Sequence, residues 1–179
     1  MSAARARNLR LALVVGFAAL ALVVDLWTKA WVWLELRPRP HPPRVVIEGL
    51  LQLQYALNTG AALGLGREQP WSRPVLVAVA VVTVVFVVRL AWRWPDRGWL
   101  ASCAIGLIVG GALGNLHDRL VRGVLVPGEG VRHGVVDFIV VFWAPGRAWP
   151  AFNVADIALT IGFVLMAAAL LRLRRTKGS

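Results

Sequence analysis

Four clusters of polar and charged residues stand beside long apolar segments of this chain. The clusters hold Asp25 with Lys29, Asn115 with Asp118 and Arg119, Asp137 alone, and Asn153 with Asp156. An ionisable side chain at membrane depth is costly, so it usually persists for a task or within a paired network. Several carboxyls at the same depth of a membrane favour an enzyme site over polar residues that have separate structural roles.

Asp137 and Asp156 differ from the other aspartates because neither has an adjacent basic residue. Apolar residues flank both of them, and burial among such residues raises the pKa of a carboxyl. Two carboxyls of this kind would share one proton if they met, which leaves one acid and one base to activate a water molecule. The sequence leaves open whether Asp137 and Asp156 touch.

The other two aspartates have cations close by in the sequence. Asp25 and Lys29 are four residues apart, a spacing that places them on one helix face as an ion pair. A structural or supporting role is the favoured interpretation of this pair. Asp118 with Arg119 is interpreted as an internal pair or as a clamp for other groups, and direct chemistry by Asp118 is the less favoured alternative.

Four apolar segments are long enough to cross a bilayer as helices, which requires roughly 20 residues each. We predict spans at about 11–34, 75–92, 99–116 and 152–171. Hydrophobic residues make up 58% of the 179 residues, which is high for a soluble domain, and the length predicts one domain over 1–179. The net charge of +11 alone would fit a nucleic-acid partner, but the apolar spans indicate a membrane protein with no such partner.

The basic residues predict how the spans cross the membrane. Both tails and the short connection between the second and third spans are dense in arginine. Because positively charged loops stay in the cytoplasm, we predict cytoplasmic termini. The first and third spans then run outward, and all four polar clusters arrive near the outer leaflet.

The segments between the spans predict a small sheet on the outer face of the membrane. Residues 51–57 alternate between apolar residues and glutamine, which is typical of a strand, and a turn is predicted at 58–60. We expect an extended spacer at 37–43, a flexible loop at 123–134, and Asp137 in the outer loop that leads to the fourth span. The predicted fold class is a mainly α membrane protein with four transmembrane helices and a small extracytoplasmic β-sheet.

Glycine, cysteine and histidine have structural interpretations here. Gly106, Gly110 and Gly114 recur every four residues and predict a ridge against which another helix packs closely. Cys103 lies among small apolar residues and is interpreted as packing. The three histidines are not at metal-ligand spacing, so we predict no metal site.

Five motifs occur in the order in which they are found in the lipoprotein signal peptidase family, also called signal peptidase II. They are Asp-Leu-Trp-Thr-Lys at 25–29, Asn-Thr-Gly-Ala-Ala at 58–62, Gly-Gly-Ala-Leu-Gly-Asn-Leu-His-Asp-Arg at 110–119, Val-Val-Asp-Phe at 135–138 and Phe-Asn-Val-Ala-Asp at 152–156. One motif alone is weak, but five in order are highly specific. The chain resembles this family over nearly its whole length. Family members are bacterial inner-membrane aspartyl peptidases with four spans, a small outer sheet and cytoplasmic termini.

The resemblance implies an activity and a site. Asp137 and Asp156 would form the catalytic dyad, and the substrate would be a prolipoprotein cut just before a cysteine that bears a diacylglyceryl group. It implies membrane lipids as surroundings and no metal or organic cofactor. Substrate-binding or supporting roles are implied for Asn58, Gly60, Asn115, Asp118, Arg119, Asn153, Asp25 and Lys29. Two departures are Leu26, where the family often has Gln, and a stretch between Arg119 and Asp137 that is longer than in many members.

The alternative function is a proton- or ion-coupled membrane transporter, because intramembrane aspartates often mark ion paths. It predicts acidic groups spread through the membrane depth and internal repeats with broken helices. A non-catalytic scaffold is a third interpretation, and it predicts that Asp137 and Asp156 tolerate replacement by Asn.

Overall fold

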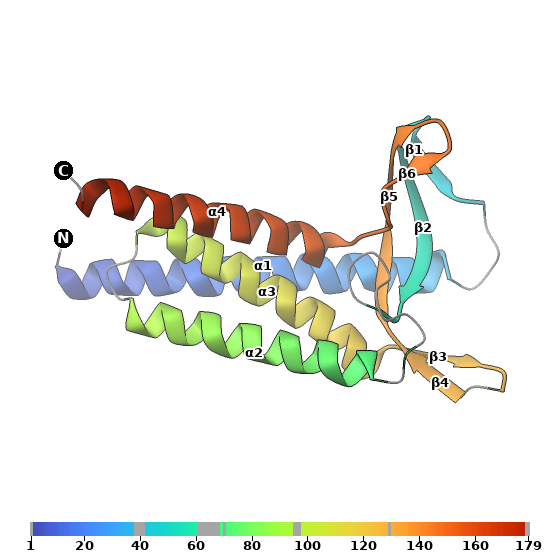
Figure 1. The fold of residues 1–179 in the computed structure, drawn as a ribbon, viewed down its shortest axis with the longest axis horizontal. Coiled ribbons are helices and arrows are strands. Elements are labelled where there is room, and N and C mark those ends of the chain that lie inside the picture. The colour runs from blue at the N-terminus through green and yellow to red at the C-terminus, as the bar shows by residue number, and fades with distance from the viewer. Residues whose placement is uncertain are drawn as a thin grey trace.

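Four long helices run side by side, and the strands gather at one end of them (Figure 1). The computed structural model describes residues 2–37, 42–60, 69, 71–94, 98–128 and 130–177. The helices are α1 Ala3–Glu35, α2 Ser72–Arg93, α3 Trp99–Val121 and α4 Val154–Lys177. All four are long and apolar enough to cross a membrane. The prediction of four helices apolar enough to span a membrane is confirmed, but α3 continues past the predicted end at 116 to Val121, so its polar cluster lies inside the helix.

Helix α3 lies at the centre of the bundle and packs against the other three helices. Its glycines allow this close approach. A Cβ atom at Gly106 would lie 2.6 Å from the Val14 carbonyl oxygen, and one at Gly110 would lie 2.5 Å from the Ala18 carbonyl oxygen, both in α1. On another face, a Cβ at Gly111 would lie 2.6 Å from a backbone oxygen of α4. The predicted packing ridge is confirmed, and Cys103 is buried in the same helix.

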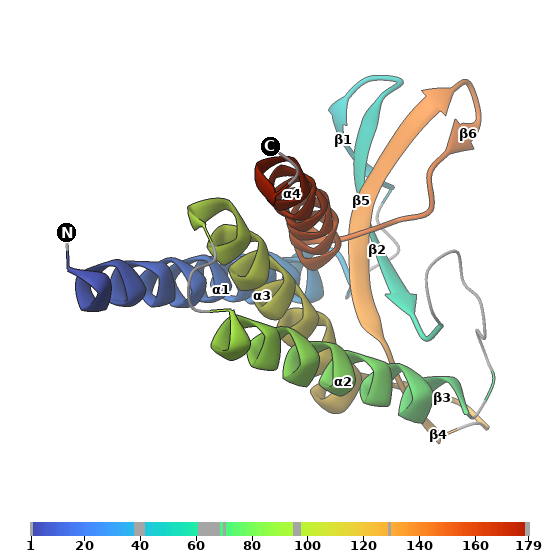
Figure 2. The same ribbon diagram turned by 60° about the vertical axis from the view of Figure 1, so that its left-hand side comes forward.

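The predicted small sheet is confirmed. Four antiparallel strands pair in the order β1-β2-β5-β6. They are β1 Arg44–Ile47, β2 Leu51–Asn58, β5 Val135–Ala144 and β6 Arg147–Ala148. Figure 2 shows this sheet standing beyond one end of the helices, and Figure 1 shows both termini at the other end.

Two predictions about the connection between α3 and α4 are wrong. The stretch expected to be a flexible loop forms a hairpin of β3 Gly123–Val126 and β4 Gly130–His133, although residue 129 lies outside the described residues. Asp137 lies in the long strand β5 rather than in a loop. The run of β-branched and aromatic residues around Asp137 favours a strand, and pairing with β2 gives its backbone groups their partners.

Some predictions fall on parts of the chain that the structure does not describe. The expected spacer at 37–43 depends on residues 38–41, which lie outside the described residues, as do residues 61 and 62 of the motif at 58–62. The turn at 58–60 begins inside β2, because Asn58 is the last residue of that strand.

Candidate active site

Asn153 joins the two aspartates that the sequence singled out. Its side-chain amide donates a hydrogen bond of 2.6 Å to Asp137 Oδ1, and its backbone N–H donates one of 3.1 Å to Asp156 Oδ2. Asp137 comes from β5 and Asp156 from the first turn of α4. The structure therefore brings these two carboxyls together around one buried asparagine, which the sequence left open.

The position of Asp156 follows from local sequence at the start of α4. The Asp156 N–H donates to Asn153 Oδ1 over 3.0 Å, while the Asn153 N–H donates to Asp156 Oδ2. This reciprocal arrangement is a capping box, in which two side chains three residues apart satisfy free amides at a helix start. The same bonds that begin the helix fix the Asp156 carboxylate.

Asp137 is held from its other side by strand β2. Its Oδ2 accepts a hydrogen bond of 2.9 Å from the Asn58 side-chain amide. The Asn58 Oδ1 in turn accepts the Gly60 N–H over 3.0 Å, so the amide of Asn58 has a fixed direction. Gly60, the third residue of the predicted turn, is buried and acts through its backbone.

Asn115 connects Asp156 and Asn153 to the buried Lys29 of α1. Its side-chain N–H donates to Asp156 Oδ1 over 2.9 Å, and its Oδ1 accepts from Lys29 Nζ over 2.8 Å and from Asn153 over 3.2 Å. With its oxygen occupied by Lys29 and Asn153, Asn115 must present its N–H to Asp156.

The predicted ion pair of Asp25 and Lys29 is confirmed, with 2.8 Å between Nζ and Oδ2. Both side chains are fully buried, so Lys29 stays inside the protein rather than extending to the membrane surface. The other carboxylate oxygen of Asp25 accepts the Ala155 N–H of α4 over 2.8 Å. This pair thus positions the start of α4, one residue before Asp156.

Of the two interpretations of Asp118 with Arg119, the internal pair is not among the ion pairs of the described residues, whereas Asp118 does hold other groups. Asp118 Oδ1 lies 3.1 Å from Arg122 Nε, and Asp118 Oδ2 lies 3.4 Å from Lys29 Nζ. Residues four apart face each other on a helix, which allows the contact with Arg122. The ring of the adjacent His117 also approaches Asp118, with 3.4 Å between its Nδ1 and Oδ1. Asp118 Oδ2 also accepts the Val136 N–H over 3.1 Å, so Asp118 holds β5 at the residue before Asp137.

Arg119 is half-buried in the last turn of α3. Its guanidinium donates to the Asn115 carbonyl oxygen over 3.3 Å. It is close enough to Asp156, Asp137 and Asp118 to interact electrostatically with all three. A cation in this place can stabilise negative charge that develops beside the dyad.

The surroundings of Asp137 raise the pKa of its carboxyl from 3.8 to about 6. Burial is the largest cause, and the side chain is only 4% exposed. The negative charge of Asp156 acts in the same direction, whereas the amides of Asn58 and Asn153 and the charge of Lys29 oppose it. A carboxyl with this pKa can give and take a proton near neutral pH.

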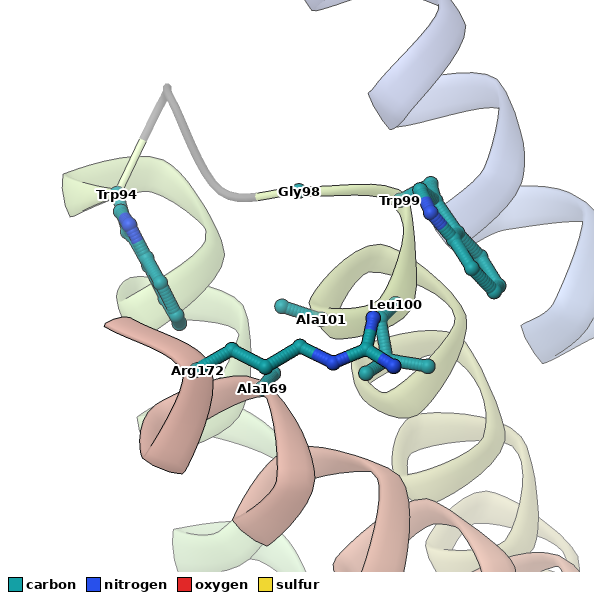
Figure 3. Close-up of a pocket in the computed structure, with 7 residues that line it drawn as sticks. All are labelled: Trp94, Gly98, Trp99, Leu100, Ala101, Ala169 and Arg172. Carbon is teal, nitrogen blue, oxygen red and sulfur yellow. The ribbon is translucent and has the colours of Figure 1, made fainter. Parts of the chain in front are cut away.

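A cleft at the opposite end of the bundle has a different character. Figure 3 shows it between the chain around Trp94 and Trp99 and the last turns of α4, with Arg172 across it. Its lining is almost wholly apolar apart from that guanidinium: Trp94, Gly98, Trp99, Leu100, Ala101, Ala169 and Arg172. It contains none of the polar clusters, so the candidate active site lies at the sheet end.

The sequence predictions missed one member of the site, Arg122. The available signal was its spacing of four residues from Asp118 in the predicted end of a helix. That signal was obscured because the span was expected to stop at 116. Among the described residues, no group of three or more His, Cys, Asp or Glu side chains is arranged to hold a metal ion.

Comparisons with known proteins agree with the motifs. Residues 17–172 match the family model described as Signal peptidase (SPase) II. A lipoprotein signal peptidase of Pseudomonas aeruginosa is 38% identical over 159 residues, which cover 88% of this chain and 86% of that protein. A lipoprotein signal peptidase of Symbiobacterium thermophilum is 37% identical over 153 residues, covering 85% of this chain and 90% of that protein.

Solved structures show the same fold. One bacterial membrane enzyme superposes with a TM-score of 0.72 at 27% identity, covering 89% of this chain and 87% of that one. A second has a TM-score of 0.68 at 26% identity, with coverage of 88% and 92%. The family model spans most of the chain, and the two relatives match 88% and 85% of the chain. The chain therefore belongs to the signal peptidase II family.

Proposed function

We propose that this protein is an aspartyl endopeptidase that removes signal peptides from prolipoproteins. The bond it cuts lies just before a cysteine that carries a diacylglyceryl group. The relatives named lipoprotein signal peptidase support this reaction. The observation that carries the proposal is the meeting of Asp137 and Asp156 around Asn153, with amide groups bound to both carboxylates.

Asp137 and Asp156 divide the proton transfers of peptide hydrolysis. One carboxylate takes a proton from a water molecule, whose oxygen attacks the scissile carbonyl carbon. The other gives its proton to the leaving nitrogen when the C–N bond breaks. Because the two negative charges oppose each other and Asp137 has a raised pKa, the dyad readily holds the single proton that this division requires.

The neighbouring side chains keep the dyad ready for this reaction. Asn58, Asn115 and Asn153 donate to the carboxylates and fix their orientation. Arg119 faces the negative charge that forms on the tetrahedral intermediate. Fixed donors cost no rearrangement during the reaction, which is the physical basis of this kind of stabilisation.

The site lies where a lipid-anchored substrate would present its scissile bond. The helices expose large apolar side chains suited to lipid contact, among them Trp27, Phe86 and Phe163. With both termini in the cytoplasm of a bacterial cell, the dyad and the sheet stand at the outer leaflet of the inner membrane. A diacylglyceryl anchor in that leaflet holds the adjoining peptide bond at this depth, with membrane lipids around it.

The transporter alternative receives no support from the comparisons. It predicted acidic groups through the whole membrane depth. The acidic residues of the four helices are instead Asp25 and Glu35 in the second half of α1, Asp118 near the end of α3 and Asp156 in the first turn of α4. These are the parts of α1, α3 and α4 that lie toward the sheet (Figure 1). A gathering at one end fits a reaction site better than a path.

Cleavage by the purified full chain in detergent tests the proposed function. The substrate is a prolipoprotein carrying the diacylglyceryl group, and its unmodified form is the control. We expect only the modified form to be cut, with product masses that place the cut before the modified cysteine. No cleavage by folded protein, or a cut elsewhere, would refute the proposed activity.

A further inference from the structure

Two acidic and two basic side chains contact one another beside the dyad: Asp25, Lys29, Asp118 and Arg122. We call them the charged tetrad. The first three side chains are fully buried, and the Arg122 side chain is 12% exposed. Lys29 contacts both carboxylates, at 2.8 Å from Asp25 and 3.4 Å from Asp118. Arg122 supplies the second positive charge, 3.1 Å from Asp118.

Lys29 has a further contact that the dyad needs. Its Nζ donates hydrogen bonds of 2.8 Å to Asp25 Oδ2 and to Asn115 Oδ1, and it lies 3.4 Å from Asp118 Oδ2 as an ion pair. The bond to Asn115 orients the Asn115 amide toward Asp156. Arg122 shares the charge of Asp118, so Lys29 is not the sole cation for both carboxylates.

Asp118 is also attached to the strand that carries Asp137. Its Oδ2 accepts the Val136 N–H over 3.1 Å while Oδ1 faces Arg122. If Arg122 were neutral, Asp118 would draw Lys29 toward itself, because an uncompensated charge is costly when buried. This shift of Lys29 disturbs the contacts that position the dyad.

The side chain of Arg122 reaches across several elements. Its guanidinium carbon lies 5.6 Å from the centre of the Trp33 ring in α1, and Trp33 makes an edge contact with Tyr55 in β2, with ring centres 6.1 Å apart. Strand β2 ends at Asn58, which donates to Asp137. Arg122 Nη1 is buried and has no hydrogen-bond partner among the described residues, so the ion pair with Asp118 is its main polar anchor.

We propose that Arg122 is a positioning residue for the dyad: it neutralises Asp118, which keeps Lys29 on Asn115 and holds the Val136 amide in place. Arg122 touches no reacting atom and acts through Asp118. This role rests on the proposed peptidase function, but it has its own test.

The test compares cleavage kinetics of the full chain in detergent for four variants: Arg122→Gln, Arg122→Lys, Asp118→Asn and Asp118→Asn with Arg122→Gln. Arg122→Gln should lower kcat by about 10- to 100-fold with little change in KM, because the dyad is misplaced while substrate contacts remain. Arg122→Lys should restore most of the rate. The double variant should lose less than the two single losses combined, because it removes the opposed charges together.

Arg147→Gln is the matched control, since Arg147 also lies over a tryptophan ring, Trp143, at 5.3 Å, but is exposed and far along the sheet. It should keep the wild-type rate. An unchanged kcat for Arg122→Gln, a lysine variant as slow as the glutamine variant, or simply additive losses would each overturn the role of Arg122. Wild-type cleavage would leave the peptidase function standing in all three cases. If Arg122→Gln does not fold, the lysine and double variants still decide the question.

Discussion

Two groups of carboxylates lie side by side at the sheet end of the bundle, and they are held in opposite ways. Asp25 and Asp118 have Lys29 and Arg122 against them. Among the described residues, the carboxylates of Asp137 and Asp156 receive hydrogen bonds only from amides, two of them from Asn153 and one each from Asn58 and Asn115. The difference separates two tasks. Cations make a buried carboxylate a fixed structural anchor, whereas amides orient a carboxylate and leave it able to exchange protons.

Lys29→Met should have the largest effect on folding. It leaves Asp25 and Asp118 with one cation fewer, and removing one partner of a buried ion pair costs about 3–5 kcal/mol. Thermal and denaturant unfolding in detergent would measure this loss of stability. Asp137→Asn would be measured in the same way for comparison. A Lys29→Met variant as stable as wild type would contradict the distinction between the cation-paired carboxylates and the amide-bonded ones.

The second-largest effect concerns Asp137, whose carboxyl should make the free energy of unfolding depend on pH. The Asp137 carboxyl has a pKa of about 6 in the folded protein against an ordinary 3.8. Between these two pH values the folded state therefore binds more protons at Asp137 than the unfolded state does. Its contribution to the free energy of unfolding therefore falls as pH rises from about 4 to about 6, by about 3 kcal/mol in total. Asp137→Asn should lack this part of the dependence.

The measurement is unfolding of both proteins in detergent across that pH range. The wild type should gain stability relative to Asp137→Asn as the pH is lowered to about 4. Parallel curves for the two proteins would show that Asp137 keeps an ordinary pKa, which contradicts its assignment to the proton-exchanging group.

Gly114→Ala tests how tightly the charged tetrad is packed. A Cβ atom at Gly114 would clash with the Asp25 carboxylate oxygen that bonds Lys29. We expect a loss of about 1–3 kcal/mol, as for other overpacked sites. Gly16→Ala is the control, because nothing lies within 4 Å of its Cβ position, and it should leave stability unchanged or slightly higher. Equal behaviour of the two variants would argue against the packing constraint.

Asn58→Ala should have the smallest effect. It removes one amide from the Asp137 carboxylate, which costs about 1 kcal/mol of stability. The same change raises the pKa of Asp137 further, because this hydrogen bond favours the charged form. The pH profile of cleavage should shift upward accordingly. Gln54→Ala, at an exposed position of the same strand, should leave the profile where it is, and an unmoved profile for Asn58→Ala would contradict its role.

Much of this arrangement can be predicted from the sequence because membranes impose simple rules. Apolar length predicts the four spans, and the spacing of Asp25 and Lys29 predicts their pairing. The capping box at Asn153 and Asp156 is also local, since its two residues are three apart. Each of these features depends on a short stretch of chain.

The remaining features depend on contacts between distant segments. The bond from Asn58 to Asp137 joins residues 79 apart in the chain, and that from Asn115 to Asp156 joins residues 41 apart. No local pattern specifies which amide faces which carboxylate. Asp118 illustrates the limit, because its partner Arg122 follows from helix geometry only once the helix is known to extend to Val121.

Single-turnover cleavage of a diacylglyceryl-modified prolipoprotein by Asp137→Asn and Asp156→Asn tests the central claim most directly. Thermal unfolding would first confirm that both variants fold. We predict that each loses about 10²- to 10⁴-fold in rate while remaining folded, because each loses a group that transfers a proton. A folded variant of either aspartate that cleaves at the wild-type rate would contradict the assignment of the dyad.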